Sequence, residues 1–184
     1  MELTSYLRIQ ARANRLSNHR LHAAMAPLSH AEFHAPRVGF FPSLAETLNH
    51  ILLVDLYYIG ALHREAGTRA ALMGFERLDD LATLARRQAA SDERLIAWCD
   101  ALDDARLDAV VEMERADHIQ RDRAGHVLAH LFNHQTHHRG QAHAMLSSTT
   151  IAPPQLDEFM MPSEAHLRTP DMAALRWREA DVYR

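Results

Sequence analysis

Apolar side chains recur about every three to four residues in four long stretches of the chain, a spacing typical of amphipathic helices. The first stretch covers residues 3–27 and is followed by a polar run over residues 29–34. Pro27, Pro36 and Gly39 interrupt the pattern there, because proline and glycine disfavour a continuous helix. We therefore expect one long helix over residues 3–27 and a break before the next.

The second helix has a well-defined start. Ser43 and Glu46 stand three residues apart, so that each side chain can satisfy a free backbone amide at a helix N-terminus. The helix is expected to run to about Arg64, and Gly67 is a suitable stop. Apolar residues cover most of its circumference, which indicates a helix at the centre of its bundle.

Two further helices are expected over residues 81–102 and 123–148. Residues 68–80 are interpreted as the connection that precedes the first of them. Residues 105–122 separate the two helices and are ambiguous, because their few apolar positions fit a short strand or hairpin. Those positions are Val110, Val111 and Met113.

Four long amphipathic helices with long connections predict an all-α protein, specifically a four-helix bundle. Pro153 and Pro154 end the last long helix, and Thr169-Pro170 is a suitable start for a short helix in the tail. The sequence contains no internal repeat and no domain linker. Its 184 residues are enough for one domain with its own core.

Composition excludes several classes of protein. All 20 basic residues are arginine, and the absence of lysine removes Schiff-base and P-loop chemistry. The six glycines form neither GxGxxG nor GxSxG. The net charge is −4 and the arginines are dispersed, so the sequence has no basic patch of the kind that binds nucleic acid. No apolar stretch approaches the roughly 20 residues of a membrane span. We expect a soluble, cytoplasmic protein that binds neither nucleic acid nor membrane, and the single Cys99 is consistent with a reducing compartment.

Histidine is the unusual component, with 14 residues in the chain and a concentration of them in the fourth predicted helix. At about 100° per residue, the apolar stripe of this helix is centred about 60–70° from His134. His138 falls inside the stripe, about 40° from His134, and His134 lies at its edge. His130 and His137 fall on the boundary or outside. The pattern therefore selects His134 and His138 as the pair that the bundle buries.

These two histidines are four residues apart, so their imidazoles lie one turn apart on one helix face. A divalent metal ion would partner both, because a buried polar group without a partner costs about 1–3 kcal/mol. Catalytic metal sites usually have three protein ligands, and His50 in the second helix is the third candidate. Taken alone, His50 is more simply interpreted as a hydrogen-bonded core residue. Most of the other histidines are expected at the surface.

Four segments closely resemble the sequence motifs of the DinB/YfiT-like family of metal-binding proteins. The resemblance spans about residues 5–157, and the NHxxHHRGQ string makes it specific. The segments are residues 130–141 (HLFNHQTHHRGQ), 48–52 (LNHIL) with Asp55, 13–16 (ANRL) and 39–44 (GFFPSL).

The resemblance implies an up-down-down-up bundle, which we place over residues 1–158. We expect residues 159–184 to be an extension packed on the same domain. It implies one metal ion, usually zinc or nickel, held by His50, His134 and His138. Family members include thiol-dependent S-transferases and a maleylpyruvate isomerase that use low-molecular-weight thiols, and homodimers are common. This chain departs from the pattern in its longer, more polar 105–122 connection and in the tail from Met160.

Three functions remain open on these grounds. The first is a metal-dependent enzyme of the thiol-dependent S-transferase type, with a small-molecule substrate. The second is a metal-binding bundle without turnover that acts in stress response, and the third is a purely structural helical dimer. No residue is assigned a catalytic role, because a capping, surface or core role is the better reading of each possible helper. These helpers are Asp55, Tyr57, Tyr58, Arg139 and Gln141, of which Gln141 is expected near His134.

Two other features have alternative readings. Cys99 could be a reactive thiol, but a small buried residue is the better reading, since no nearby pattern lowers its pKa. Two pairs of arginines could attract an anionic substrate, although ordinary solvated surface is the better reading. The pairs are Arg86 with Arg87 and Arg121 with Arg123.

Overall fold

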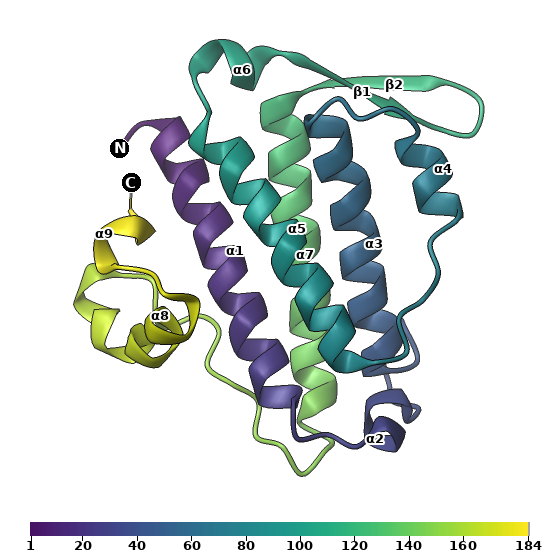
Figure 1. The fold of residues 1–184 in the computed structure, drawn as a ribbon, viewed down its shortest axis with the longest axis vertical. Helices are drawn as coiled ribbons and strands as arrows, with labels where there is room; N and C mark the ends of the chain where they lie inside the picture. Colours follow the sequence, from purple (N-terminus) through teal and green to yellow (C-terminus); the bar gives the residue numbers. More distant parts are fainter. Residues whose placement is uncertain (184) are drawn as a thin grey trace.

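Four long helices form the body of the protein in the computed structural model, which describes residues 1–183 (Figure 1). In the orientation of Figure 1, the first and last of them run down the page and the middle two run up. This arrangement confirms the expected all-α, up-down-down-up bundle. The helices are α1 (Leu3–Met25), α3 (Leu44–Leu62), α5 (Leu81–Asp100) and α7 (Ala124–Leu146).

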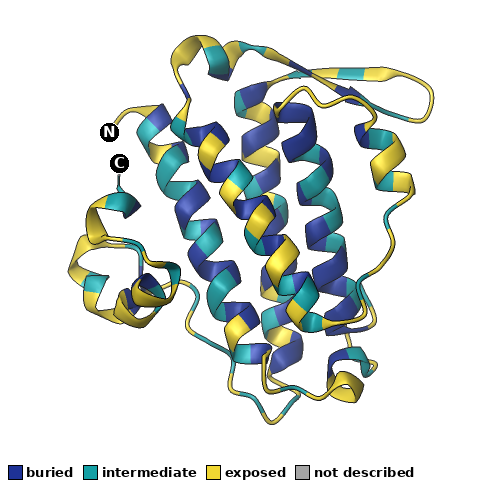
Figure 2. Cartoon of the chain, in the orientation of Figure 1, coloured by how far each residue is buried: buried dark blue, intermediate teal, exposed yellow. Residues whose placement is uncertain are grey.

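Leucine-rich faces hold the bundle together. The closest pairings are α1 with α5 and α3 with α7, and α3 also packs on α5. Each helix directs its buried face inward and its exposed positions outward (Figure 2). Leu48 and Leu52 of α3, for example, share one buried cluster with Leu84 and Leu146. Full burial of a leucine side chain contributes about 1.5–3 kcal/mol, so such clusters supply most of the stability.

The predicted start of α3 is confirmed in part. The Ser43 hydroxyl accepts a hydrogen bond from the Glu46 backbone N–H at 3.2 Å. The Glu46 carboxylate, however, pairs with Arg77 at 2.5 Å and so does not complete a capping box. The helix ends slightly before the expected Arg64, which has a left-handed backbone with φ of 57°.

Two segments that were expected to be irregular contain short helices. The polar run at 29–34 includes α2 (His30–His34), and the 68–80 connection includes α4 (Thr68–Met73), which follows the left-handed Gly67. Helices of one or two turns are too short to show a clear period, which explains why the pattern did not predict them.

The ambiguous 105–122 segment forms a hairpin, as one of its readings predicted. A short helix, α6 (Asp104–Asp108), leads into the antiparallel strands β1 (Val110–Glu114) and β2 (Ile119–Arg123). The Tyr57 hydroxyl on α3 donates to the Glu114 carbonyl at 2.6 Å. The hairpin therefore lies fixed across one end of the bundle (Figure 1).

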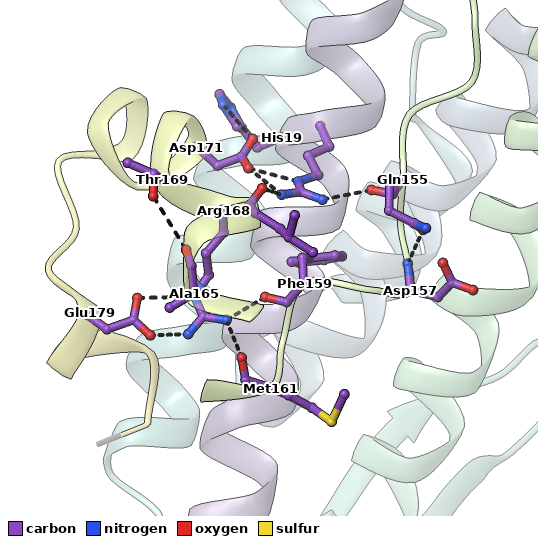
Figure 3. A network of polar contacts seen from close by, with 12 residues as sticks. His19, Gln155, Asp157, Phe159, Met161, Ala165, Arg168, Thr169, Asp171 and Glu179 are labelled. Atoms are coloured by element: carbon purple, nitrogen blue, oxygen red, sulfur yellow. Dashed lines mark hydrogen bonds and ion pairs between the residues drawn. The ribbon is translucent and has the colours of Figure 1, made fainter. Parts of the chain in front are cut away.

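The C-terminal segment packs against α1 (Figure 3). It contains a 3₁₀ helix (Pro162–Arg168), the predicted short helix α8 (Thr169–Leu175) and α9 (Glu179–Val182). Arg20 of α1 donates to the Asp171 carboxylate at 2.8 Å, and its guanidinium lies 4.1 Å from the centre of the Phe159 ring. Phe159 also shares a small buried cluster with Leu16 of α1. Among residues 1–183, no helix combines the length and the apolar character that crossing a bilayer requires.

Candidate metal centre

Three imidazoles converge where α3 packs against α7. His50 comes from α3, and His134 and His138 come from successive turns of α7. Their candidate ligand atoms all lie within 4.8 Å of one another. The Nε2 atoms of His50 and His134 are 3.0 Å apart, and the ring centres of His134 and His138 are 4.4 Å apart. The packing of two helices thus brings together the three residues that the sequence singled out.

The centre is less enclosed than the sequence suggested. His138 is buried, but His50 and His134 are only half-buried. The reading of His50 as a core residue is therefore wrong. Although α3 is apolar around most of its surface, His50 lies at its contact with α7, where the Phe41 ring covers it at a centre-to-centre distance of 4.4 Å. Partial exposure means that solvent reaches His50 and His134.

Gln141 fixes the orientation of His138. The side-chain oxygen of Gln141 lies 2.8 Å from Nδ1 of His138 and can only accept a hydrogen bond, so Nδ1 carries the proton. Nε2 of His138 is then left with a free lone pair for a metal ion. The expectation that Gln141 contacts His134 is wrong. Gln141 is three residues after His138, and residues three apart on a helix are neighbours, whereas His134 lies two turns away from Gln141.

All three imidazoles are held in the neutral form. Burial, followed by the charge of His138, lowers the pKa of His50 to about 4. Burial and the neighbouring histidines lower the pKa of His134 to about 3. Burial also lowers the pKa of His138, against an opposing contribution from its hydrogen bond to Gln141. Because a metal ion binds only unprotonated imidazole, the cluster is ready for coordination at neutral pH.

The donor set fits a divalent metal ion. Zn–N bonds of about 2.0–2.1 Å place tetrahedral nitrogen ligands roughly 3.4 Å apart, which is close to the spacing of His50 and His134. Nδ1 of His134 is buried without a hydrogen-bond partner among the described residues. Nε2 is the nitrogen of His134 that faces His50, so Nε2 is the atom that would coordinate an ion.

A buried polar network lies beside the cluster and does not contact it. The Asp55 carboxylate accepts hydrogen bonds from Gln88 at 2.7 Å and from Gln135 at 3.0 Å. Burial and the charge of Asp92 raise the pKa of Asp55 to about 7. Gln135 follows His134 directly in the sequence, so the network helps to fix the turn of α7 that carries this histidine.

Arg139 supplies the positive charge of the same network. It donates to Asn14 at 2.6 Å and to Asn18 at 3.0 Å, and both asparagines donate to Asp92. Burial lowers the pKa of Arg139 to about 10. The roles of Gln88, Asn18 and Asp92 were not predicted from the sequence. The available signal was the presence of polar residues at core-facing positions of α1 and α5.

The other residues considered have structural roles. Tyr57 and Tyr58 hold the hairpin, since the Tyr58 hydroxyl accepts a hydrogen bond from Arg115 at 3.2 Å. Cys99 is buried as expected, and burial raises the pKa of its thiol to about 12. Both arginine pairs are exposed, as the surface reading predicted. His22 is an exception among the other histidines, most of which were expected at the surface, because it is buried and burial lowers its pKa to about 4.

A cavity of about 550 Å³ lies between α1 and α5. His22 and Asn18 line its α1 side, and Gln88 and Asp92 line its α5 side. None of the three clustered imidazoles lines it. This cavity and the candidate metal centre therefore lie in different parts of the bundle.

The fold and the histidine cluster agree with a comparison against models of protein families, which matches the DinB family over residues 6–172. The chain belongs to the DinB family. The DinB match extends through the 3₁₀ helix into α8, so the part of the tail from Met160 to residue 172 is not additional to the family pattern, contrary to expectation. A search of curated proteins finds no match to this DinB chain.

Proposed function

We propose that the chain is a metal-dependent enzyme of the thiol-dependent S-transferase type. The observation that carries the proposal is the convergence of His50, His134 and His138, which offers three neutral nitrogen donors within 4.8 Å of one another. Imidazole ligands suit both zinc and nickel, and this donor set favours neither. Membership of the DinB family supports the proposal.

A divalent ion with neutral ligands supplies one chemical effect when bound, because it lowers the pKa of a coordinated thiol or water and so yields a nucleophile near neutral pH. The residues of the chain provide the setting. Gln141 keeps Nε2 of His138 unprotonated. Phe41 packs on His50 and His138, with ring centres at 4.4 and 5.5 Å, and excludes water from that side.

The thiol has to come from outside the protein. Cys99 is the single cysteine of the chain, it is fully buried on α5, and the pKa of its thiol is raised to about 12. A thiol of this kind cannot act as a nucleophile at neutral pH. We therefore assign the thiol to a low-molecular-weight cosubstrate that reaches the half-buried imidazoles, where it would attack an electrophilic substrate.

The test begins with protein purified without an affinity tag. Its zinc and nickel content is measured for the wild type, His138→Ala and His126→Ala. His126 is an exposed histidine of the same helix and serves as the matched control. We expect about one ion per chain at the imidazole cluster in the wild type and the control, and its loss in His138→Ala.

The three proteins are then loaded with metal and assayed with small thiols and electrophiles. Turnover that is present in the wild type and in His126→Ala but absent in His138→Ala would support an enzyme. Stoichiometric metal without turnover with any thiol would overturn the enzyme proposal and favour the metal-binding stress-response bundle. The homodimer is also proposed from the resemblance, and analytical ultracentrifugation tests it.

A further inference from the structure

A second group of metal-ligating side chains lies apart from the first. His30 and His34 are the first and last residues of α2, and Asp79 lies in the connection between α4 and α5. Nε2 of His30 is 2.8 Å from Oδ2 of Asp79, and Nε2 of His34 is 3.2 Å from Oδ1 and 2.9 Å from the Asp79 backbone carbonyl. The ligand atoms of these three residues also lie within 4.8 Å of one another.

The two imidazoles are arranged around a single acidic residue, Asp79. His30 and His34 are four residues apart, so one turn of helix places both on the same face. Their rings stack with centres 4.3 Å apart and planes inclined by 29°, and both Nε2 atoms point at Asp79. Two imidazoles and one carboxylate form a ligand set typical of zinc sites. We propose that His30, His34 and Asp79 form a second binding site for a divalent cation of the zinc class.

The short helix that carries the imidazoles is well supported. Phe33 is only 2% exposed and anchors α2 in the core. Ser29 accepts a hydrogen bond from the Glu32 backbone N–H at the start of the helix. Arg37 donates to the carbonyls of Glu32 and Ala35 at its end. The histidines are therefore held in position although α2 has only five residues.

The residues on either side of Asp79 are fixed as well. The Leu78 backbone is hydrogen-bonded in both directions to the side chain of Asn49 on α3. Asp80 caps α5 by accepting from the Thr83 backbone N–H at 2.7 Å. Both halves of the site are thus anchored in the bundle, and little conformational freedom is lost when a cation binds.

Stability of the protein does not explain this cluster. The side chains of His30, His34 and Asp79 are 65%, 32% and 78% exposed, and exposed ion pairs contribute little to stability. The same exposure leaves room for water to complete the coordination of a cation. His30 and Asp79 also line the 550 Å³ cavity between α1 and α5, so the site opens onto this cavity.

A cation at this site would tie α2 to the α4–α5 connection. The segment after α2, residues 35–43, carries Phe41 to the first imidazole cluster. The second site would thereby fix the start of the segment that covers the first. This inference does not rest on the proposed function, since the two clusters share no ligand.

Calorimetric titration with Zn²⁺ of the untagged full-length chain, stripped with a chelator, tests the proposal. We expect about two Zn²⁺ per wild-type chain and about one in Asp79→Asn and in His34→Ala. His118→Ala is the matched control. Nδ1 of His118 lies 2.7 Å from Oδ1 of the exposed Asp117, but the pair has no third candidate ligand among residues 1–183, so this variant should bind like the wild type.

The two sites are separated by titrating His138→Ala, which should lose one Zn²⁺ and keep the one that Asp79→Asn loses. Unchanged stoichiometry in Asp79→Asn, or an equal loss in His118→Ala, would overturn the second site. Asp79→Asn replaces an exposed side chain and should therefore fold, so it tests the second site even if His34→Ala does not fold. If the first cluster binds no metal, the wild type binds about one Zn²⁺ and Asp79→Asn binds none.

Discussion

The side chain of Asn49 and the backbone of Leu78 exchange two hydrogen bonds. Nδ2 of Asn49 donates to the Leu78 carbonyl at 2.9 Å, and the Leu78 N–H donates to Oδ1 of Asn49 at 2.8 Å. Asn49 directly precedes His50 of the first cluster, and Leu78 directly precedes Asp79 of the second. One reciprocal contact therefore helps to position a ligand of each candidate site.

Replacement of Asn49 by alanine should weaken both sites and the fold. The substitution leaves two polar groups of Leu78 without a partner, and each such group costs about 1–3 kcal/mol when it is buried. Urea unfolding should show a loss of this order, and Zn²⁺ titration should show weaker binding at each cluster. Asn49→Asp keeps the acceptor for the Leu78 N–H and should lose less. Wild-type stability in Asn49→Ala would contradict this role.

Gln141 should control metal affinity more than stability. Gln141→Ala removes the acceptor that keeps the proton on Nδ1 of His138, and loss of such a partner typically lowers metal affinity about 10–100-fold. Competition with a zinc indicator dye measures the affinity, and thermal unfolding of the metal-free protein measures the stability. Gln141→Glu retains an acceptor and should restore binding. Equal affinity in Gln141→Ala and the wild type would show that His138 is oriented by other contacts.

The buried carboxylate of Asp55 should make the free energy of unfolding depend on pH. Burial and the charge of Asp92 raise the pKa of Asp55 from its ordinary 3.8 to about 7. The folded chain therefore binds a proton that the unfolded chain has released. The resulting stabilisation is complete below the ordinary pKa and is lost as the pH rises through about 7.

Urea unfolding of the wild type and Asp55→Asn between about pH 5 and pH 8 checks this effect. The free energy of unfolding of the wild type should fall relative to that of the variant as the pH increases. The buried histidines titrate in both proteins, so their contribution cancels in the difference. Parallel curves for the two proteins would show that Asp55 has an ordinary pKa.

Arg168 should hold the parts of the C-terminal segment together. Its guanidinium is fully buried, pairs with Glu179 and donates to the carbonyls of Phe159 and Met161 (Figure 3). Arg168→Met keeps the aliphatic volume but leaves the two carbonyls without this donor. We expect limited proteolysis to cut the extension faster in this variant while the bundle stays intact.

Arg178→Ala is the control for that experiment. Arg178 forms an ion pair with Asp181, but it is exposed, and such pairs contribute little to stability. Its cleavage rate should resemble that of the wild type. If Arg168→Met and Arg178→Ala are cut at the same rate, burial of Arg168 is not what secures the extension.

The repeated spacing of apolar residues was sufficient to predict the bundle. Helices of some twenty residues repeat their apolar spacing several times, so the positions of α1, α3, α5 and α7 followed from the pattern. The spacing of His134 and His138 placed both on one face of α7, because helix geometry alone determines that relationship. The hairpin was recognised as one of two readings from the apolar positions of β1.

Features that depend on contacts between elements could not be predicted in this way. The half-buried position of His50 results from the packing of α3 on α7 and from the placement of Phe41. The partnership of Gln141 with His138 depends on side-chain direction, which a helical wheel does not describe. Asp79 is 45 residues from His34, and only the path of the α4–α5 connection brings them together.

Phe41, whose ring packs on the imidazole cluster, belongs to none of the long helices. It comes from the segment at 35–43, in which Val38 and Phe40 are exposed while Phe41 packs on His50 and His138. Packing of the scaffold and shaping of the space around the imidazoles are thus encoded in separate stretches of sequence. Because of this division, substitutions in residues 35–43 can change which molecules fit beside the imidazoles while the fold of the bundle stays the same.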